Sequence, residues 1–266
     1  MEILKTKNDT THEMIYHYNT IIKTYANNEK KIKYSTYSNS IGLPNLKKSG
    51  GSLSEEEKQY QKYKNLYNTK QNIIDLAYHN GLIKKWEYFV TLTFDDQKVN
   101  AKDYISVSEA LAKWLDNMKH QNKSMEYILA PEPHKSGRIH FHGIFRNVPK
   151  WTLIEARNPK SNRLIKKNGK QIYNLANYKY GYTTISKIDN LEAISVYMSK
   201  YMTKDLIDLA YKKRYWSSKS LKRPSIEYAY FNEEQLNFYI DKSKYNVEEH
   251  KVEKENFSTT YYAIRS

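Results

Sequence analysis

Residues 125–145 read MEYILAPEPHKSGRIHFHGIF, and this stretch decides the fold. Two runs typical of β-strands, residues 125–132 and 139–145, flank a short polar segment that contains a glycine. If Lys135-Ser136-Gly137 forms a three-residue turn with its glycine in the left-handed conformation, Glu132 lies directly opposite His140 on the same face of a hairpin. A two-residue turn would place Glu132 on the other face.

The segments on both sides of this hairpin extend the pattern. Residues 87–94 are a β-branched and aromatic run of strand length, and residues 103–121 have apolar side chains every three or four positions, as in an amphipathic helix. A further strand is expected at 181–188 and a helix at 190–209. This order predicts an α+β domain of the RRM or ferredoxin-like type, with a mainly antiparallel sheet and helices on one face.

The remaining segments are polar. Ser54 followed by Glu57 is a capping box, which predicts a helix from residue 55 to about residue 78, and a short strand is expected at 228–231. The predicted boundaries are a polar N-terminal arm with little core over 1–53, a helical lead-in over 54–86, the α+β domain over 87–231 with an irregular insertion at about 150–180, and a charged C-terminal extension over 232–266.

The composition favours a nucleic-acid partner. The 266 residues include 44 Lys and Arg against 29 Asp and Glu, for a formal net charge of +15. Such a basic balance is typical of polyphosphate binders, although a compositional bias toward Lys, Asn, Ile and Tyr would produce it too. There is no apolar run of about 18 residues, so we expect no membrane contact. There is also no cysteine, so any metal must be held by His, Asp, Glu or water.

His140 and His142 are candidate metal ligands. Residues two apart in a strand share a face, so the two imidazoles point the same way and form half of a divalent metal site. Glu132 is the candidate third ligand, with His134 as a rival, and the mixed N/O donor set suits Mg or Mn. The alternative reading is a pair of histidines without a functional role.

The helix predicted at 190–209 carries paired tyrosines. Tyr197 and Tyr201 lie one turn apart beside its apolar stripe, and Lys200 and Lys204 each follow a tyrosine by three residues. A tyrosine hydroxyl can attack a phosphodiester, and a nearby ammonium group can stabilise the charge on the phosphate. The alternative is an amphipathic helix with tyrosines at the edge of the core.

Three segments in order, residues 89–94, 134–145 and 196–204, resemble the three motifs of HUH-superfamily rolling-circle replication initiators, or Reps. The resemblance is closest to the two-tyrosine Reps of phages and small plasmids, whose third motif has two tyrosines four apart among lysines. It implies a His pair on a central strand, a tyrosine helix facing it, a divalent metal and a covalent 5'-phosphotyrosine intermediate. Many relatives carry an acidic residue eight positions before the first His, where this chain has Glu132.

The resemblance implies a nicking enzyme that cuts single-stranded replication origin DNA, leaves a free 3'-OH and later rejoins strands. Because no P-loop motif occurs in the sequence, a host helicase would unwind the DNA, and a host polymerase would extend the 3' end in the cytoplasm of a bacterial host. We expect Tyr197 to cleave first and Tyr201 second. The alternatives are an HUH transposase or mobilisation nickase, or a non-catalytic RRM-like single-stranded nucleic-acid-binding protein.

Further residues are expected to contact DNA. After the tyrosine helix, cations and aromatics alternate in a pattern that can hold phosphates and stack bases. As an alternative, this segment is a loop whose two aromatic residues pack on the domain. The expected DNA-contacting residues are Thr91, Thr93, His134, Lys135, Arg138, Lys212, Lys213, Arg214, Tyr215, Trp216, Lys219, Lys222 and Arg223.

Overall fold

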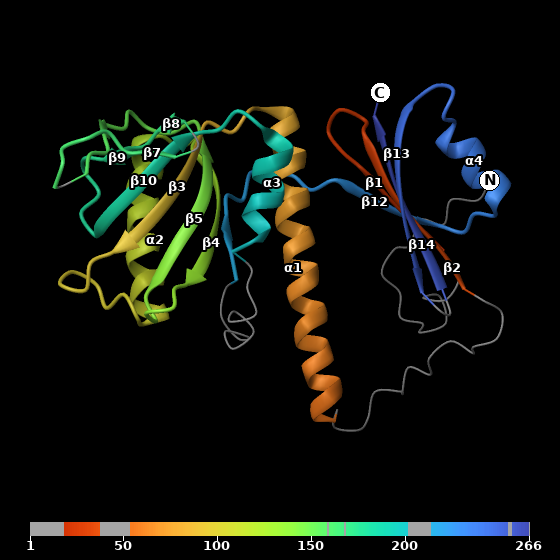
Figure 1. Ribbon diagram of the computed structural model, residues 1–266, viewed down its shortest axis with the longest axis horizontal. Coiled ribbons are helices and arrows are strands. Elements are labelled where there is room, and N and C mark those ends of the chain that lie inside the picture. Colours follow the sequence, from red (N-terminus) through yellow and green to blue (C-terminus); the bar gives the residue numbers. More distant parts are fainter. Residues whose placement is uncertain are drawn as a thin grey trace. The chain divides into compact units, whose positions relative to one another are not determined.

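A computed structural model describes residues 19–37, 54–158, 160–167, 169–201, 214–254 and 257–265. The chain forms two compact units (Figure 1). The central unit comprises residues 53–222, and the terminal unit combines the segment before it with the segment from Arg223 onward.

The central unit contains a seven-stranded sheet in the order β11-β4-β5-β3-β10-β9-β6. Its strands are β3 (Tyr88–Phe94), β4 (Glu126–Pro133), β5 (Ile139–Arg146), β6 (Leu153–Glu155), β9 (Tyr173–Leu175), β10 (Gly181–Lys187) and β11 (Trp216–Ser217). A separate two-stranded pair comprises β7 (Lys166–Lys167) and β8 (Lys170–Gln171). The helices are α1 (Glu55–Ile83), α2 (Tyr104–Gln121) and α3 (Leu191–Ser199).

The heart of this sheet has the RRM-like arrangement. Along the chain the elements run β3, α2, β4, β5 and β10, and in space the strands lie in the order β4-β5-β3-β10, each antiparallel to its neighbour. The predicted α+β class with a mainly antiparallel sheet is confirmed. The predicted insertion at 150–180 is not wholly irregular, because it provides the edge strands β6 and β9 and the β7-β8 pair.

One face of the sheet packs on α2. Val90, Leu92 and Phe94 alternate along β3 and point into this core together with Phe141 and Phe145 of β5. Helix α2 begins after Asp103, whose carboxylate caps the backbone N–H of Ser106. It then presents its apolar stripe to the strands; the buried members of that stripe are Val107, Ala110, Leu111, Trp114 and Leu115.

The opposite face of the sheet packs on α1 and α3, which lie side by side (Figure 1). Ile128 of β4 and Ile144 of β5 meet Ile73 and Leu76 of α1 and Met198 of α3 in this second core. The prediction that the helices lie on one face was wrong. The residues of β4 and β5 alternate between the two faces, and both sets are apolar, so each face needs a cover.

Helix α1 begins at the predicted capping box of Ser54 and Glu57 but runs past the expected end at residue 78. His79 and Asn80 are buried, which keeps the chain helical as far as Ile83. The Asn80 side chain donates to the carbonyl of Lys222 and accepts from its backbone N–H.

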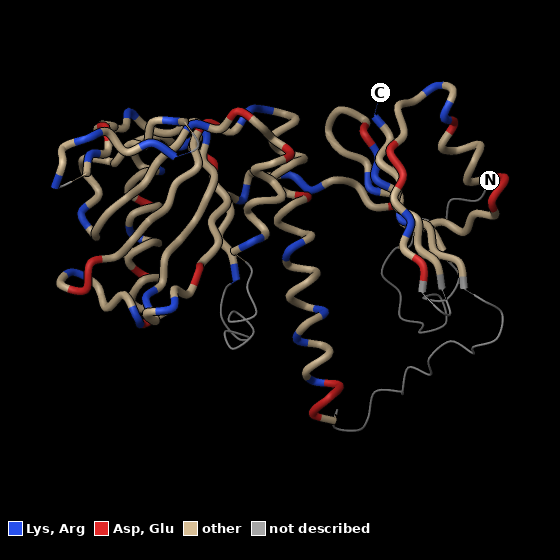
Figure 2. The backbone as a smooth tube through the Cα atoms, in the orientation of Figure 1, with Lys and Arg blue, Asp and Glu red and all other residues tan. Residues whose placement is uncertain are grey.

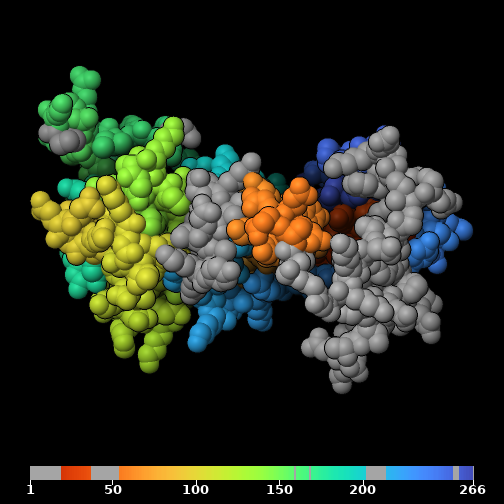
Figure 3. Space-filling model, turned by 90° about the horizontal axis from the view of Figure 1, so that it is seen from below, coloured from red at the N-terminus to blue at the C-terminus, as the bar shows by residue number. Residues whose placement is uncertain are grey.

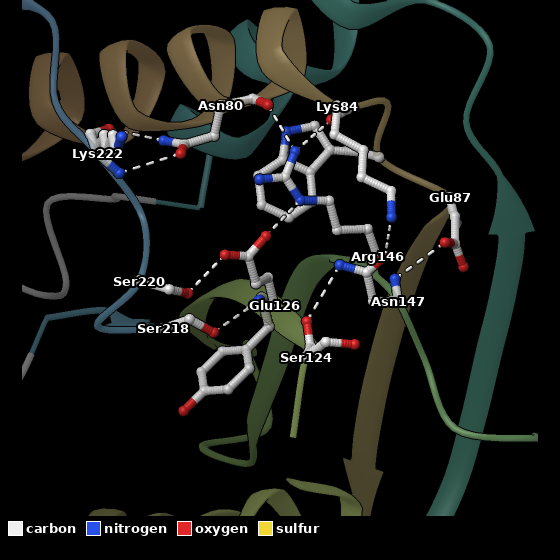
Figure 4. A network of polar contacts seen from close by, with 12 residues as sticks. Asn80, Lys84, Glu87, Ser124, Glu126, Arg146, Asn147, Ser218, Ser220 and Lys222 are labelled. Atoms are coloured by element: carbon white, nitrogen blue, oxygen red, sulfur yellow. Dashed lines mark hydrogen bonds and ion pairs between the residues drawn. The ribbon is translucent and has the colours of Figure 1, made fainter. Parts of the chain in front are cut away.

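An ion pair fastens the end of α1 to the sheet (Figure 4). Arg146 at the end of β5 donates from Nε to Glu126 at 2.6 Å and from Nη1 to the carbonyl oxygens of Asn80 and Lys84. Its guanidinium lies 4.7 Å from the ring centroid of Trp86. Because Arg146 is only 3% exposed, these contacts connect two strands, the helix end and the following loop inside the protein.

The terminal unit is a five-stranded antiparallel sheet in the order β12-β1-β2-β14-β13. Its strands are β1 (Thr20–Thr24), β2 (Lys30–Tyr37), β12 (Ser225–Ala229), β13 (Asn246–Lys254) and β14 (Phe257–Arg265), and its helix is α4 (Glu233–Ile240). Ile22, Ile32 and Ile264 from three strands pack against Leu236 and Ile240 of α4.

This unit corrects the predicted boundaries. The described part of the predicted N-terminal arm and the predicted C-terminal extension pair in one sheet with its own core, and the strand expected near 228–231 belongs to that sheet. The pattern was missed because the buried residues of β2, Ile32 and Tyr34, are isolated among lysines. The partner β14 also lies more than 200 residues away along the chain.

Candidate active site

The hairpin of β4 and β5 positions the candidate metal ligands. Its turn has the predicted three-residue form, with Gly137 at φ 79°, and the backbone N–H of His134 donates to Arg138 O at 2.7 Å. Glu132 pairs with His140 in the resulting register. The expected register is therefore confirmed, and Glu132, His140 and His142 share the face of the sheet that carries α3.

Two threonines of β3 hold the histidine rings. Thr91 Oγ1 lies 3.0 Å from His142 Nδ1, and Thr93 Oγ1 lies 3.1 Å from His140 Nδ1. The two rings are nearly parallel, at 8°, with centroids 6.4 Å apart. The threonines were expected near DNA, but in the structure they orient the imidazoles and leave Nε2 of each ring directed away from β3. A hydroxyl group can donate or accept, so it supports either ring tautomer.

Both histidines are held in the neutral form. Burial lowers the pKa of His140, and the neighbouring His134 and Arg138 add to the effect. Burial also lowers the pKa of His142, to about 3, assisted by His140 and Lys167. Neutral imidazoles keep a lone pair available, which is the state that a metal ligand requires.

Glu132 contacts only one of the two histidines. Its Oε2 atom lies 2.6 Å from His142 Nε2. The carboxylate would favour a protonated ring, but burial of His142 outweighs this effect, so we read the contact as a hydrogen bond from a neutral imidazole. His134, the rival ligand, has its ring centroid 5.6 Å from that of His140.

The donor types at this site fit a divalent metal, whereas their spacing is not that of a completed site. Among the residues that the structure describes, no three His, Asp or Glu side chains are grouped closely enough to hold an ion. Two neutral imidazoles and one carboxylate nevertheless form the mixed donor set that Mg or Mn accepts.

Helix α3 brings the paired tyrosines onto the histidines. Asn190 caps the helix by accepting from the N–H of Ala193, and Met198 is fully buried against the sheet, which fixes the rotation of α3. Tyr201, just beyond the helix, stacks on the ring of His142 at 3.8 Å and 7°. Tyr197 meets Tyr201 edge to face, with ring centroids 5.4 Å apart.

The two tyrosines have different surroundings. Tyr201 is 7% exposed, and burial together with a hydrogen bond to Tyr197 raises the pKa of its hydroxyl well above the usual range. Tyr197 is half-buried, and Lys200 Nζ lies 5.1 Å from the centroid of its ring. In this arrangement Tyr197 is the more accessible nucleophile.

Several predicted DNA contacts have structural partners instead. Arg138 donates to Asp96 at 2.7 Å and to the carbonyl of Phe94, which fastens the hairpin to the end of β3. Trp216, expected to stack on bases, is 7% exposed and packs edge-on against Phe141 at 4.9 Å. The alternative reading of this segment, as residues packed on the domain, holds for Trp216 because β11 pairs with β4.

The other predicted contacts lie elsewhere on the protein. Lys135 is exposed in the hairpin turn, Lys219 and Lys222 are exposed after β11, and Tyr215 packs partly on the second core. Arg214 Nη1 lies 3.4 Å from Thr69 of α1, and Arg223 begins the terminal unit. Lys204, Lys212 and Lys213 lie outside the described residues, as does the predicted helix beyond residue 201.

Two further residues belong to the site. Phe89 lies edge to face with Tyr197 at 5.4 Å and parallel to Tyr201 and His142 at 6.2 and 6.1 Å. The two-residue period of β3 puts it on the face of Thr91, so the sequence contained a signal for it. Lys167 of β7 is close enough to affect the ionisation of His142, and no pattern in the insertion pointed to it.

The comparisons with known proteins agree with this geometry. Residues 87–206 match a family model described as a replication-associated protein of the ORF2 type. The match spans β3 through the tyrosine pair, so it covers every residue assembled at the site, and it supports a DNA-binding replication protein of the Rep type. No curated protein and no solved structure matches the chain.

The helices of the described segments were also compared with the requirements for crossing a membrane. None of them is both long enough and apolar enough to do so.

Proposed function

We propose that this protein initiates rolling-circle replication as a two-tyrosine HUH nickase. It would cut single-stranded origin DNA by tyrosine attack and hold the new 5' end covalently. The match to the replication-associated protein family supports the role in replication, and the site supports the chemistry.

One observation carries the proposal. Tyr201 is stacked on His142 at 3.8 Å, and Tyr197 lies next to Tyr201, so a pair of nucleophiles adjoins a pair of neutral metal-ligand side chains. A binding module with a sheet surface would need neither pair. A basic chain and a Rep-type match make DNA the expected substrate.

The reaction follows from the positions of these side chains. The Tyr197 hydroxyl loses its proton and its oxygen attacks the phosphorus of one phosphodiester. A tyrosine–phosphorus bond forms as the bond from phosphorus to O3' breaks, and the departing O3' takes up a proton to become a free 3'-OH. Lys200, whose ammonium lies over the Tyr197 ring, would stabilise negative charge on the phenolate and on the phosphate.

Glu132, His140 and His142 would hold the divalent metal. Bound there, Mg or Mn would act as a Lewis acid that polarises the scissile phosphate. Thr91 and Thr93 would keep the imidazoles oriented, because each hydroxyl contacts the Nδ1 atom of a ring.

The second tyrosine would act later in the cycle. In the structure Tyr201 is buried and its hydroxyl is bonded to Tyr197, so it is protected from early reaction. Once Tyr197 is joined to DNA, its oxygen becomes a phosphate ester and that hydrogen bond weakens. Tyr201 would then cleave the completed strand, and the 3'-OH would rejoin the ends.

The test uses single-stranded oligonucleotides tiled across the DNA molecule that carries the gene. Each is labelled at its 3' end and incubated with the full-length protein and Mn. We expect an adduct that survives denaturant and is lost with a chelator. The matched 5'-labelled product should be shortened and extendable by a polymerase.

Tyrosine variants locate the nucleophile. Y197F should abolish the first cleavage, and Y201F should leave it but block strand transfer. Y60F removes an exposed hydroxyl on α1, 66% exposed, and should change neither step. An adduct that persists in the Y197F/Y201F double variant would refute the proposal. Binding of single-stranded DNA without any adduct would favour a non-catalytic module, and cleavage only at transposon ends would favour a transposase.

A further inference from the structure

A cavity of about 350 Å³ lies beside Tyr197 in the central unit. Its walls come from four segments: the β7-β8 pair, the end of β10, the first turns of α3, and Phe89 of β3. Figure 3 shows that part of the insertion, coloured green, projects at one edge of the central unit. The β7-β8 pair of the insertion therefore encloses space next to the candidate active site.

The lining has two chemical parts. Phe89, Ile172, Ile188 and Ile194 make apolar walls, and Tyr197 closes one side. The lining also includes cations: Lys167, Lys170 and Lys187. Figure 2 marks Lys and Arg positions along β7, β8 and the end of β10. A ligand for this cavity has a flat apolar body joined to an anionic group.

The lysines are not equivalent. Lys170 is already paired with Asp189, which fixes the β7-β8 pair against the loop before α3. Lys167 acts electrostatically on His142, so its ammonium faces the histidines as well as the cavity. A phosphate held by Lys167 would therefore lie between the cavity and the proposed catalytic centre.

The volume selects the size of the ligand. At roughly 30 Å³ for each water-sized group, the cavity has room for about a dozen heavy atoms. That is the size of one nucleobase and too small for two stacked bases. The aromatic edges of Phe89 and Tyr197 provide contacts that are tolerant of base identity.

We propose that this cavity binds the unpaired base of a nucleotide next to the phosphate that Tyr197 attacks, with Lys167 on the linking phosphate. This inference rests on the proposed function and adds a substrate subsite to it. The insertion then takes part in substrate selection. Binding one base in the cavity turns its nucleotide out of the stack and fixes which phosphate reaches Tyr197.

Abasic substitution tests the proposal directly. Once a cleaved oligonucleotide is found, each nucleotide around the nick is replaced in turn by an abasic residue. For the wild-type protein we expect one position adjacent to the nick to slow adduct formation roughly 5- to 100-fold, the range produced by losing one stacked base. A uniform response at all adjacent positions would overturn the inference.

Filling the cavity provides the second arm. A193W places an indole in the cavity from an exposed position of α3, and V196W places the same side chain on the exposed surface of that helix, away from the cavity. A193W should slow the intact substrate as much as the abasic residue does, and the two changes together should add nothing. Equal rates for A193W and V196W would refute the base site.

Lysine variants test the phosphate contact. K167A should weaken binding to a (dT)12 oligonucleotide at least 5-fold by fluorescence anisotropy, whereas K166A, on the same two-residue strand but outside the cavity lining, should change it less than 2-fold. Equal affinities for the two variants would remove Lys167 from the proposal.

The two proposals fail differently. If the wild-type protein forms no adduct with any oligonucleotide, the nicking function fails. The cavity is then judged by (dT)12 binding alone, compared with a 12-residue abasic backbone. A193W should reduce the wild-type preference for (dT)12, and an unchanged preference would refute the cavity as a base site.

Discussion

Replacement of Arg146 by methionine should destabilise the central unit strongly. Methionine retains the apolar stem, but it removes the donors to Glu126 and to the carbonyl oxygens of Asn80 and Lys84. Glu126, whose side chain is 15% exposed, would keep its charge without a cation. Breaking a buried ion pair from one side costs about 3–5 kcal/mol, and the two orphaned carbonyls favour the upper half of that range.

The measurement is urea unfolding followed by tryptophan fluorescence. All four tryptophans, at positions 86, 114, 151 and 216, belong to the central unit, so the signal reports that unit alone. R157M is the matched control: it breaks an exposed arginine–glutamate pair whose side chains are about half exposed, and it should cost less than about 1 kcal/mol.

The pH dependence adds a second test of the same pair. Burial by itself raises the pKa of Glu126, but hydrogen bonds from Ser220 and Arg146 outweigh it, so the pKa lies below its ordinary value of 4.5. The charged Glu126 therefore stabilises the wild type above pH 4.5, and this contribution is lost in acid. The deficit of R146M should shrink below pH 4.5. A loss no larger than that of R157M at neutral pH would refute the reasoning.

Three further changes have defined outcomes. The folded-state pKa of His142, about 3, lies below the ordinary 6.5, so the unfolded state binds the extra proton between these values. The free energy of unfolding should fall by about 2 kcal/mol from pH 6.5 to 5, and H142Q should lack this slope in urea titrations. T91V should weaken Mn binding about 10-fold in calorimetry, unlike T184V on the neighbouring strand. G143A should cost about 3 kcal/mol or more in the same unfolding assay, because its Cβ would lie 2.7 Å from the carbonyl of Ile128.

The sequence predicted the strands and the register of the central unit because they depend on local rules. The hairpin register follows from one turn with Gly137 at positive φ, and the alternation of β3 follows from its own residues. The face of α3 follows from the buried position of Met198 between the two tyrosines. Each of these predictions required only neighbouring residues.

The missing parts depend on distant contacts. The terminal sheet pairs β1 with β12 and β2 with β14, and its strands carry too many lysines to show a clear period. The role of Trp216 depended on whether β11 would pair with β4, which its two residues cannot indicate. Lys167 reaches His142 from an insertion whose path the sequence left open.

The spacing of the two tyrosines constrains how both could act on DNA. At 3.6 residues per turn, continued helical geometry places positions four apart about 6 Å apart along the axis and about 40° apart around it. If α3 slid to present Tyr201 where Tyr197 now lies, Met198 would leave the apolar core in which it is fully buried. Exposing that side chain would cost about 1.5–3 kcal/mol before any other contact is lost. Under the proposed function, we therefore expect the second scissile phosphate to move along the site toward Tyr201 while the helix stays in place.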